Sequence, residues 1–328
     1  MNEIHLTRRR VLATGLAAAS ALACPALARS APPTLAIGGP AFGTSRNATL
    51  SSATANAESL QSALLGTLTR IDRLMSPWRR DSAITAFNER RSQEWQPIDR
   101  EIAAVVRGAL SVRRASEKAF DIAVGPQVGR WGFGPMAAAE VPPDAEIRIS
   151  DAALCKSHPE LTVDLCGIAK GYALDQMVSV LREHGEEDFV VDLGGEVAAV
   201  GYHPSGRSWQ IAVEDPRHGH FGSAEIIALD ERAIATSGDK VHGYTFGGRR
   251  YSHIIDPTTD EPVEGAAASV SVIADNAMLA DGWATALVSA GVKGPALAQR
   301  NRLDALFLFD EEASLRRVAV GRFDEYLA

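Results

Sequence analysis

The spacing of apolar residues along the chain predicts four helices of ordinary length. In each of them apolar residues recur every three or four positions, as they do on the buried face of an amphipathic helix. These helices are predicted at 56–75, 99–115, 169–183 and 276–290, with a shorter one at 82–88. Asn56 and Asp99 stand at two of the starts, where their side chains can accept hydrogen bonds from the free N–H groups of a first turn.

Short runs of apolar and β-branched residues predict many strands, most of them in the second half of the chain. Strands are predicted within 34–50 and at 161–163, 189–193, 197–200, 209–214, 224–229, 233–236, 269–274, 304–310 and 315–318. The segment 244–251 is typical of a hairpin with Gly247-Gly248 at its turn, and its second strand is predicted to continue to Pro257. Grouped strands and grouped helices favour an α+β fold with mixed or antiparallel sheets and helices packed on them.

One strand-to-helix junction carries residues suited to phosphate binding. Asp164 follows the predicted strand at 161–163, Gly167 supplies a turn, and Lys170 stands in the first turn of the next helix. Free N–H groups at a helix start attract phosphate, and a lysine there adds a positive charge. By itself the pattern is more often a tight strand-to-helix connection with no ligand.

A second pair of polar residues has the spacing of metal ligands. Asp281 and Thr285 are four residues apart on the predicted helix 276–290, so they share one face. A carboxylate and a hydroxyl suit a hard cation such as Mg²⁺. The alternative is a hydrogen bond between the two side chains on the helix surface.

The N-terminus has the features of an export signal. Three arginines at 8–10 precede an uncharged apolar run at 11–23, and Ala26-Leu27-Ala28 matches a cleavage site. The paired arginines predict the twin-arginine route to the periplasm, with residues 1–28 removed. The run is too short to span a membrane. The residues before Cys24 fit a lipidation motif poorly, so no lipid anchor is expected there.

Composition excludes several classes of protein. Residues 1–28 carry three arginines and one glutamate, so their removal takes the net charge from −8 to −10. Such an acidic chain is not expected to bind nucleic acid. No glycine-rich Rossmann or P-loop motif is present. The remaining residues, 29–328, are enough for one large domain or for two interleaved halves.

Several short motifs, in order along nearly the whole mature chain, together resemble one family. They are Phe42-Gly43-Thr44, Met75-Ser76-Pro77-Trp78, the segment 120–126, Trp131-Gly132-Phe133-Gly134, the segment 164–172, Val191-Asp192-Leu193-Gly194-Gly195, Ala235-Thr236-Ser237-Gly238-Asp239, the segment 251–257, and Ala280-Asp281-Gly282-Trp283-Ala284-Thr285. This set resembles the FAD:protein FMN transferases of the ApbE type. The resemblance implies an ApbE-like, T-fold-like architecture.

The resemblance also implies a reaction. Such enzymes use FAD as substrate and transfer FMN to a Ser or Thr hydroxyl of an acceptor flavoprotein, releasing AMP with the help of Mg²⁺. The export signal resembles that of members that serve respiratory membrane complexes, including those beside the nitrous oxide reductase system. Two alternatives stay open: an FAD pyrophosphatase that yields FMN and AMP, and a periplasmic flavin carrier or assembly factor without enzymatic activity.

Site residues follow from the resemblance position by position. It implies that the metal is held by Asp281, Thr285 and the backbone carbonyl of Gly167. It implies that FAD is bound by Phe42, Trp78, Asp121, Ile122, Ala123, Asp164, Lys170 and Ile255. His253 is the candidate general base for the acceptor hydroxyl, although a strand histidine can equally be held by a neighbour for structural reasons.

The sequence departs from the family pattern at three of these motifs. Phe42 stands where the family commonly has a methionine. Phenylalanine keeps the bulk of methionine but not its flexibility. Cys166 stands where Gly or Ser is common, and no redox role is expected for it. Ala284 stands where some members carry an acidic residue beside the metal, so either the metal site is weaker or a water replaces that ligand. Trp78 is expected either to stack on a ring system or to cover core.

Overall fold

The computed structural model describes residues 34–52, 56–240, 243–311 and 314–328. The predicted signal peptide, with Cys24, lies outside these residues. Within the part that is described, none of the helices combines the length and the apolar character needed to cross a membrane.

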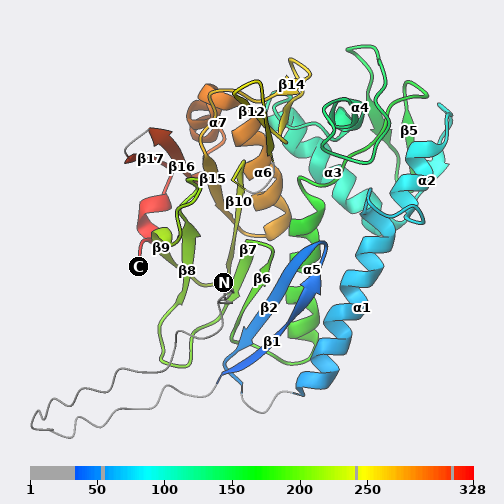
Figure 1. Cartoon of the computed structure of the whole chain (residues 1–328). Coiled ribbons are helices and arrows are strands. Elements are labelled where there is room, and N and C mark those ends of the chain that lie inside the picture. Colours follow the sequence, from blue (N-terminus) through cyan, green and yellow to red (C-terminus); the bar gives the residue numbers. More distant parts are fainter. Residues whose placement is uncertain (1–33, 53–55, 241–242, 312–313) are drawn as a thin grey trace, which may run out of the picture. The chain divides into compact units, whose positions relative to one another are not determined.

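An antiparallel sheet of eight strands forms the centre of the fold (Figure 1). Its order is β1-β2-β6-β7-β10-β15-β16-β17, and every neighbouring pair is antiparallel. In that order the strands span Leu35–Ala41, Thr44–Leu50, Phe189–Leu193, Glu196–Val200, Arg232–Gly238, Ser269–Ala274, Asp304–Glu311 and Ser314–Val320. The predicted α+β class is confirmed, and the strands predicted within 34–50 are β1 and β2, at one edge of the sheet.

Side chains alternate between the two faces of this sheet, and each face has its own core. On β10, Ala233 and Ala235 face the helices, whereas Ile234 faces the opposite side. There it packs on a separate two-stranded ladder formed by β8 (Trp209–Glu214) and β9 (Ser223–Leu229). This alternation follows from the two-residue repeat of a strand, and it explains why the central strands are apolar on both sides.

The long helices lie on one face of the sheet, with α5 between α1 and α6 (Figure 1). The helices span Ala57–Met75 (α1), Ala83–Glu89 (α2), Arg100–Ala115 (α3), Gly125–Arg130 (α4), Ala169–Glu183 (α5), Ala277–Ser289 (α6) and Gly294–Arg300 (α7). All five predicted helices are therefore confirmed. Asn56, Ser82, Asp99 and Asn276 each accept a backbone N–H bond in the first turn of the helix that follows.

The strand predicted at 161–163 is wrong. Its residues are buried and lie outside any strand. The backbone of Val163 is satisfied instead by one side chain. Its N–H donates to Oδ1 of Asn88 at 2.7 Å, and its carbonyl accepts from Nδ2 of Asn88 at 2.9 Å. An apolar run thus meets its backbone requirement without a partner strand, which a sequence pattern does not reveal.

The hairpin predicted at 244–251 is confirmed, but its continuation to Pro257 is wrong. β11 (Gly243–Phe246) and β12 (Arg249–Ser252) pair across Gly247-Gly248. The chain then leaves the ladder, because the Ser252 hydroxyl accepts the N–H of Ile254 at 3.2 Å. The next strand, β13 (Ile255–Asp256), pairs with β14 (Glu261–Pro262). The break falls at His253, so this residue stands at a corner and not within a strand.

A small sheet beside α2 contains a fully buried lysine. Its order is β3-β5-β4, with strands Gln96–Pro97, Ala153–Lys156 and Ile147–Ile149. The Lys156 ammonium donates to the backbone carbonyl of Asn88 at 2.9 Å and lies over the Phe87 ring. Burial lowers the pKa of Lys156 to about 8.

This lowered pKa predicts a pH dependence of stability. The folded pKa of Lys156 lies below the unfolded value of 10.5, so between these two pH values the unfolded chain binds more protons than the folded chain. The free energy of unfolding therefore rises as the pH increases through this window. Between pH 7 and pH 10 the free energy of unfolding of the wild type should gain about 2 kcal/mol relative to Lys156→Met. Urea denaturation of both proteins at both pH values measures this. If wild type and Lys156→Met differ in unfolding free energy by the same amount at pH 7 and pH 10, the prediction is wrong.

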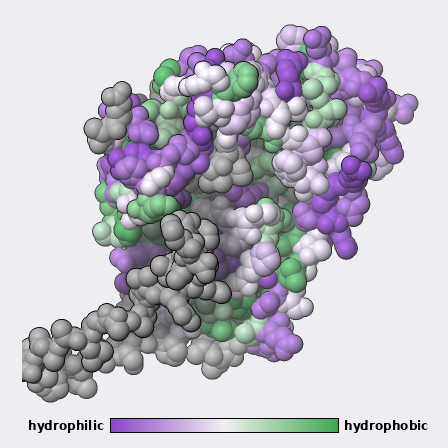
Figure 2. Space-filling model, in the orientation of Figure 1, coloured by the Kyte–Doolittle hydropathy of each residue, from purple (hydrophilic) through white to green (hydrophobic). Residues whose placement is uncertain are grey.

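The surface seen in Figure 2 is hydrophilic over most of its upper and right-hand parts, with hydrophobic residues scattered in small groups.

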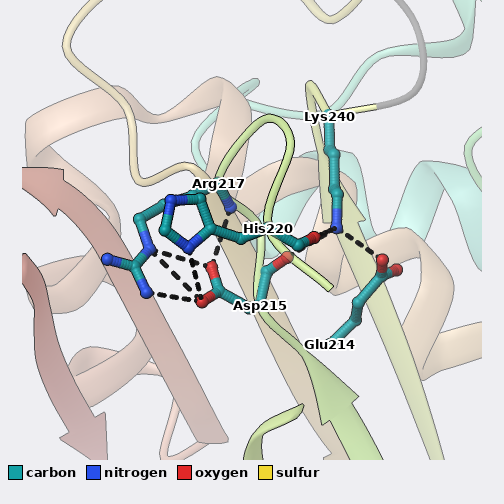
Figure 3. A network of polar contacts seen from close by, with 5 residues as sticks. All are labelled: Glu214, Asp215, Arg217, His220 and Lys240. Atoms are coloured by element: carbon teal, nitrogen blue, oxygen red, sulfur yellow. Dashed lines mark hydrogen bonds and ion pairs between the residues drawn. The ribbon is translucent and has the colours of Figure 1, made fainter. Parts of the chain in front are cut away.

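The loop between β8 and β9 is fixed by ion pairs (Figure 3). Arg217 binds the carboxylate of Asp215, and the Lys240 ammonium reaches Glu214 and the backbone carbonyls of Asp215 and His220. Lys240 thereby fastens this loop to the end of β10.

Candidate active site

The first turns of α5 and α6 lie against each other, and each is capped by an aspartate of the other helix. Asp281 of α6 accepts the N–H of Gly171 at 2.8 Å, and Asp175 of α5 accepts the N–H of Ala277 at 2.7 Å. A Cβ at Gly171 would lie 2.2 Å from the carbonyl oxygen of Ala277, so only glycine allows this approach. The reciprocal caps fix Asp281 at the start of α5, although the two lie far apart in sequence.

A tight turn before α5 brings a backbone carbonyl to the same place. Asp164 Oδ1 accepts the N–H of Cys166 at 2.8 Å, which closes the turn. The Gly167 carbonyl then lies 3.4 Å from the hydroxyl of Thr285. A Cβ at Gly167 would be 3.0 Å from Thr285 Cγ2, so a larger residue there would push Thr285 away by a few tenths of an ångström. Asp281 and Thr285 therefore both bond to the 167–171 segment. The alternative, a hydrogen bond between these two side chains on the helix surface, is not what the structure has.

These three oxygen donors suit a hard cation. A carboxylate, a hydroxyl and a backbone carbonyl are the ligands that Mg²⁺ accepts, and Mg²⁺ usually completes its shell with water and phosphate oxygens. In the part of the chain that is described, no group of three or more His, Cys, Asp and Glu side chains is placed to hold a metal. The predicted set is of another kind, because it contains a single carboxylate.

Lys170 forms an ion pair with a residue that the sequence reasoning missed. Its ammonium lies 2.8 Å from Oε2 of Glu196, whose side chain is 3% exposed. Glu196 is the first residue of β7 and shares the helix-facing side of that strand with Ala198. The available signal was a carboxylate at a core-facing position directly after Gly194-Gly195, in a strand otherwise made of Val and Ala.

Burial and charge act against each other in this group. Burial raises the pKa of Glu196, and the nearby ammonium of Lys170 offsets only part of this. Burial disfavours the charged form of Lys170, but its attraction to Glu196 and Asp281 is stronger and leaves its pKa raised. Burial likewise raises the pKa of Asp281 to about 6. Burial therefore disfavours the charged form of all three groups, and the attraction of Lys170 to the two carboxylates opposes it.

Breaking this ion pair is expected to destabilise the protein. Lys170→Met leaves the Glu196 carboxylate buried without its cation, which should lower the free energy of unfolding by about 2 kcal/mol, less than for a fully buried pair because Lys170 is partly exposed. Adding Glu196→Gln removes the stranded charge and should restore most of the loss. Urea denaturation at pH 8 in EDTA measures both. A double variant no more stable than Lys170→Met would contradict this coupling.

The segment 121–123 is joined to the turn before α5. The N–H of Asp164 donates to the carbonyl of Ile122 at 2.8 Å. Asp121 accepts the N–H of Ala123 at 3.0 Å with one oxygen and pairs with Arg113 through the other. The structure therefore brings the predicted FAD residues 121–123 beside the predicted phosphate and metal residues. Asp121 itself is engaged in shaping this segment.

Phe42 and Trp78 present rings at the surface. Phe42 and Gly43 form the two-residue turn between β1 and β2, and Phe42 has a positive φ of 49°, which is costly for a residue with a side chain. Gly194 donates to the Ser45 carbonyl at 3.0 Å, so this turn lies beside the start of β7 that carries Glu196. Trp78 is 67% exposed, so it does not cover core, and its ring is open to stacking.

His253 and Ile255 belong to the corner after the β11–β12 hairpin. His253 is half-buried and meets the Phe133 ring edge-on, with ring centroids 6.5 Å apart. Phe133 is in turn stacked on Tyr244. Ile255 is buried, and its carbonyl accepts the Ser289 hydroxyl at 3.1 Å. Asp256 accepts two bonds from Thr258, so it shapes the turn after Pro257.

Two cavities lie near this corner but outside the predicted site. One, of about 380 Å³, lies between the start of α7 and the segment 256–264. The other, of about 650 Å³, lies between the β11–β12 hairpin and the segment 263–268. Neither is lined by a predicted site residue. Among the predicted site residues, Phe42 and Trp78 are exposed, whereas Ile122, Ile255 and Asp281 are buried.

Comparison with known proteins gives one answer. The model of the ApbE family matches residues 42–307. The chain is 34% identical over 308 residues to the "FAD:protein FMN transferase" of Vibrio cholerae, covering 89% of this chain and 92% of that protein. It is 30% identical over 274 residues to the protein of the same name from Escherichia coli, covering 78% of each.

The fold agrees with solved structures as well. The crystal structure of Pseudomonas stutzeri flavinyl transferase ApbE in its apo form superimposes with a TM-score of 0.80 at 32% identity, covering 91% of this chain and 98% of that one. The family match spans the segment with Asp164, Lys170 and Asp281 and extends over most of the described sheet. The chain belongs to the ApbE family.

Proposed function

We propose that this protein transfers FMN from FAD to a Ser or Thr hydroxyl of an acceptor flavoprotein and releases AMP. The observation that carries the proposal is that Asp281 and Thr285 of α6 bond to the 167–171 segment at the start of α5, which also carries the Lys170 ammonium. Asp281 and Gly167 supply donors there, and Lys170 supplies the charge. Relatives named FAD:protein FMN transferase align over most of the chain, and this supports the same reaction class.

The chemistry that the proposal requires is a displacement at phosphorus. The acceptor oxygen forms a bond to the phosphorus on the FMN side of the FAD diphosphate, and the bridging P–O bond breaks. The bridging oxygen leaves with AMP. The proton of the acceptor hydroxyl goes to His253, because a neutral hydroxyl is a poor nucleophile. Lys170 balances negative charge on the diphosphate.

The donor set fits a divalent cation, for which Mg²⁺ is the natural candidate. Asp281, Thr285 and the Gly167 carbonyl would hold it. Such a cation would neutralise charge on the diphosphate oxygens as the bridge breaks. Segment 121–123 and the exposed rings of Phe42 and Trp78 would then hold the nucleotide and the flavin, with Asp164 and Ile255 completing the contacts.

The acceptor and the location belong to the proposal too. The arginine-rich N-terminus supports export by the twin-arginine route to the periplasm. A periplasmic subunit of a respiratory membrane complex, with a Ser/Thr flavinylation motif, is the expected acceptor.

A direct assay tests the function. Purified protein is incubated with FAD and Mg²⁺, with and without an acceptor domain that bears the Ser/Thr motif, and covalent flavin is read as fluorescence in a denaturing gel. Fluorescent acceptor together with AMP supports transfer. Rapid AMP release without acceptor identifies a pyrophosphatase instead, and FAD binding without either product identifies a carrier.

A further inference from the structure

We propose that Asn88 is a positioning residue for the metal site: its side chain holds the turn that carries the Gly167 carbonyl. The inference rests on the proposed function, because it assumes that a divalent cation binds beside α5. Asn88 lies in the last turn of α2, outside the segments that the family resemblance singled out. Its side chain bonds to the backbone of Val163, and it acts through that residue.

The contact itself is unusual for a side chain. Asn88 Oδ1 accepts the N–H of Val163 at 2.7 Å, and Asn88 Nδ2 donates to the carbonyl of the same residue at 2.9 Å. One amide thereby makes both bonds that a neighbouring strand would supply. Val163 is fully buried, so either backbone group left without a partner would carry a desolvation penalty.

A series of hydrogen bonds connects the Asn88–Val163 contact to the Gly167 carbonyl. The next residue, Asp164, is fixed at its N–H by the Ile122 carbonyl at 2.8 Å and at its carboxylate by the N–H of Cys166. The N–H of Ile168 then closes on the Leu165 carbonyl at 3.1 Å. The Gly167 carbonyl lies inside this short series, so a shift of Val163 displaces it.

Asn88 is anchored from behind. Its backbone carbonyl accepts the ammonium of Lys156 at 2.9 Å, and Lys156 is fully buried at the end of β5. Asn88 therefore connects the small sheet to the turn before α5. Burying a lysine that bonds to a backbone carbonyl costs free energy of desolvation. In return, this lysine holds the end of α2 in place.

The inference makes a prediction about metal affinity. Residues that orient metal ligands from outside the coordination shell typically change affinity 10-fold to 100-fold when removed. We expect Asn88→Ala to weaken Mn²⁺ binding about tenfold, which corresponds to about 1.4 kcal/mol. Mn²⁺ serves as a probe that replaces Mg²⁺, and electron paramagnetic resonance counts the free ion. The protein is used at full mature length with ADP present, so no flavin transfer is involved.

Asn301→Ala is the matched control. Asn301 Nδ2 donates to the carbonyls of Ala115 at 3.2 Å and Leu297 at 3.0 Å, so its removal also breaks two bonds to backbone. Both variants should lower the melting temperature, but only Asn88→Ala should weaken Mn²⁺ binding. In the transfer assay, excess Mg²⁺ should restore turnover of Asn88→Ala.

Each outcome decides something. Mn²⁺ affinity unchanged in Asn88→Ala, or reduced equally in both variants, overturns the role of Asn88 and leaves the proposed function standing. Absence of Mn²⁺ binding by the wild type removes the metal site itself, and the inference with it. If Asn88→Ala does not fold, Asn88→Asp replaces it. That variant keeps the acceptor for the Val163 N–H but loses the donor, so an affinity equal to wild type overturns the inference.

Discussion

Replacement of His253 by alanine is expected to slow FMN transfer about 100-fold to 10,000-fold, the usual contribution of a general base, while FAD binding is retained. His253 stands at the corner where the chain leaves β12, and its ring is held edge-on against Phe133. In the proposed mechanism, the acceptor hydroxyl would then have no base to take its proton. Covalent flavin on the acceptor measures the rate, and quenching of flavin fluorescence measures FAD binding.

His203→Ala is the control for this experiment. His203 is also half-buried and also meets an aromatic ring edge-on, that of Trp209 at 5.3 Å, but it lies beside β8. It should leave the transfer rate within about threefold of wild type, since surface substitutions away from a site have small effects. Equal rates in His253→Ala and wild type would exclude His253 as the base. A loss of FAD binding would assign it to substrate binding instead.

Replacement of Asp281 by asparagine is expected to lower transfer about 100-fold or more at limiting Mg²⁺, because the only carboxylate of the proposed metal site loses its charge. The asparagine keeps an oxygen for the N–H of Gly171, so the cap on α5 survives. The rate measured against Mg²⁺ concentration, together with Mn²⁺ affinity, separates loss of the metal from loss of the fold.

The reciprocal cap supplies a matched control. Asp175→Asn makes the same change in the partner aspartate, which bonds to the first turn of α6 at Ala277 and Met278. It should cost stability but change the Mg²⁺ dependence little. If both variants lose transfer to the same extent, Asp281 acts as a helix cap and not as a metal ligand.

Local patterns in the sequence were enough to find the long helices, because their apolar stripes and their capping residues agree. The short helices α4 and α7 were not predicted. Both begin with Gly-Pro, which also marks loops, although proline is well suited to a first helical turn. The apolar run at 161–163 was taken for a strand because periodicity does not distinguish a partner strand from the side chain of Asn88.

For the site, the family resemblance selected Asp164, Gly167, Asp281 and Thr285, whose hydrogen bonds lie around the start of α5. The roles assigned to these residues and to His253 stay predictions. Glu196 and Asn88 could not be identified in this way. Their roles depend on contacts across the fold: Glu196 meets Lys170 only because β7 passes beneath α5, and Asn88 meets Val163 across 75 residues of sequence. Interactions of this kind follow from tertiary packing, about which a single sequence says little.

The crossed aspartate caps also have a consequence for biosynthesis. Asp281 and the Gly171 N–H that it binds are 110 residues apart, so on the ribosome the start of α5 emerges long before its cap has been translated. A nascent or truncated chain that ends before α6 lacks both the cap and the proposed metal carboxylate. Chains that end before α6 therefore lack a ligand of the proposed metal site, and we expect flavin transfer only from molecules whose synthesis has passed α6.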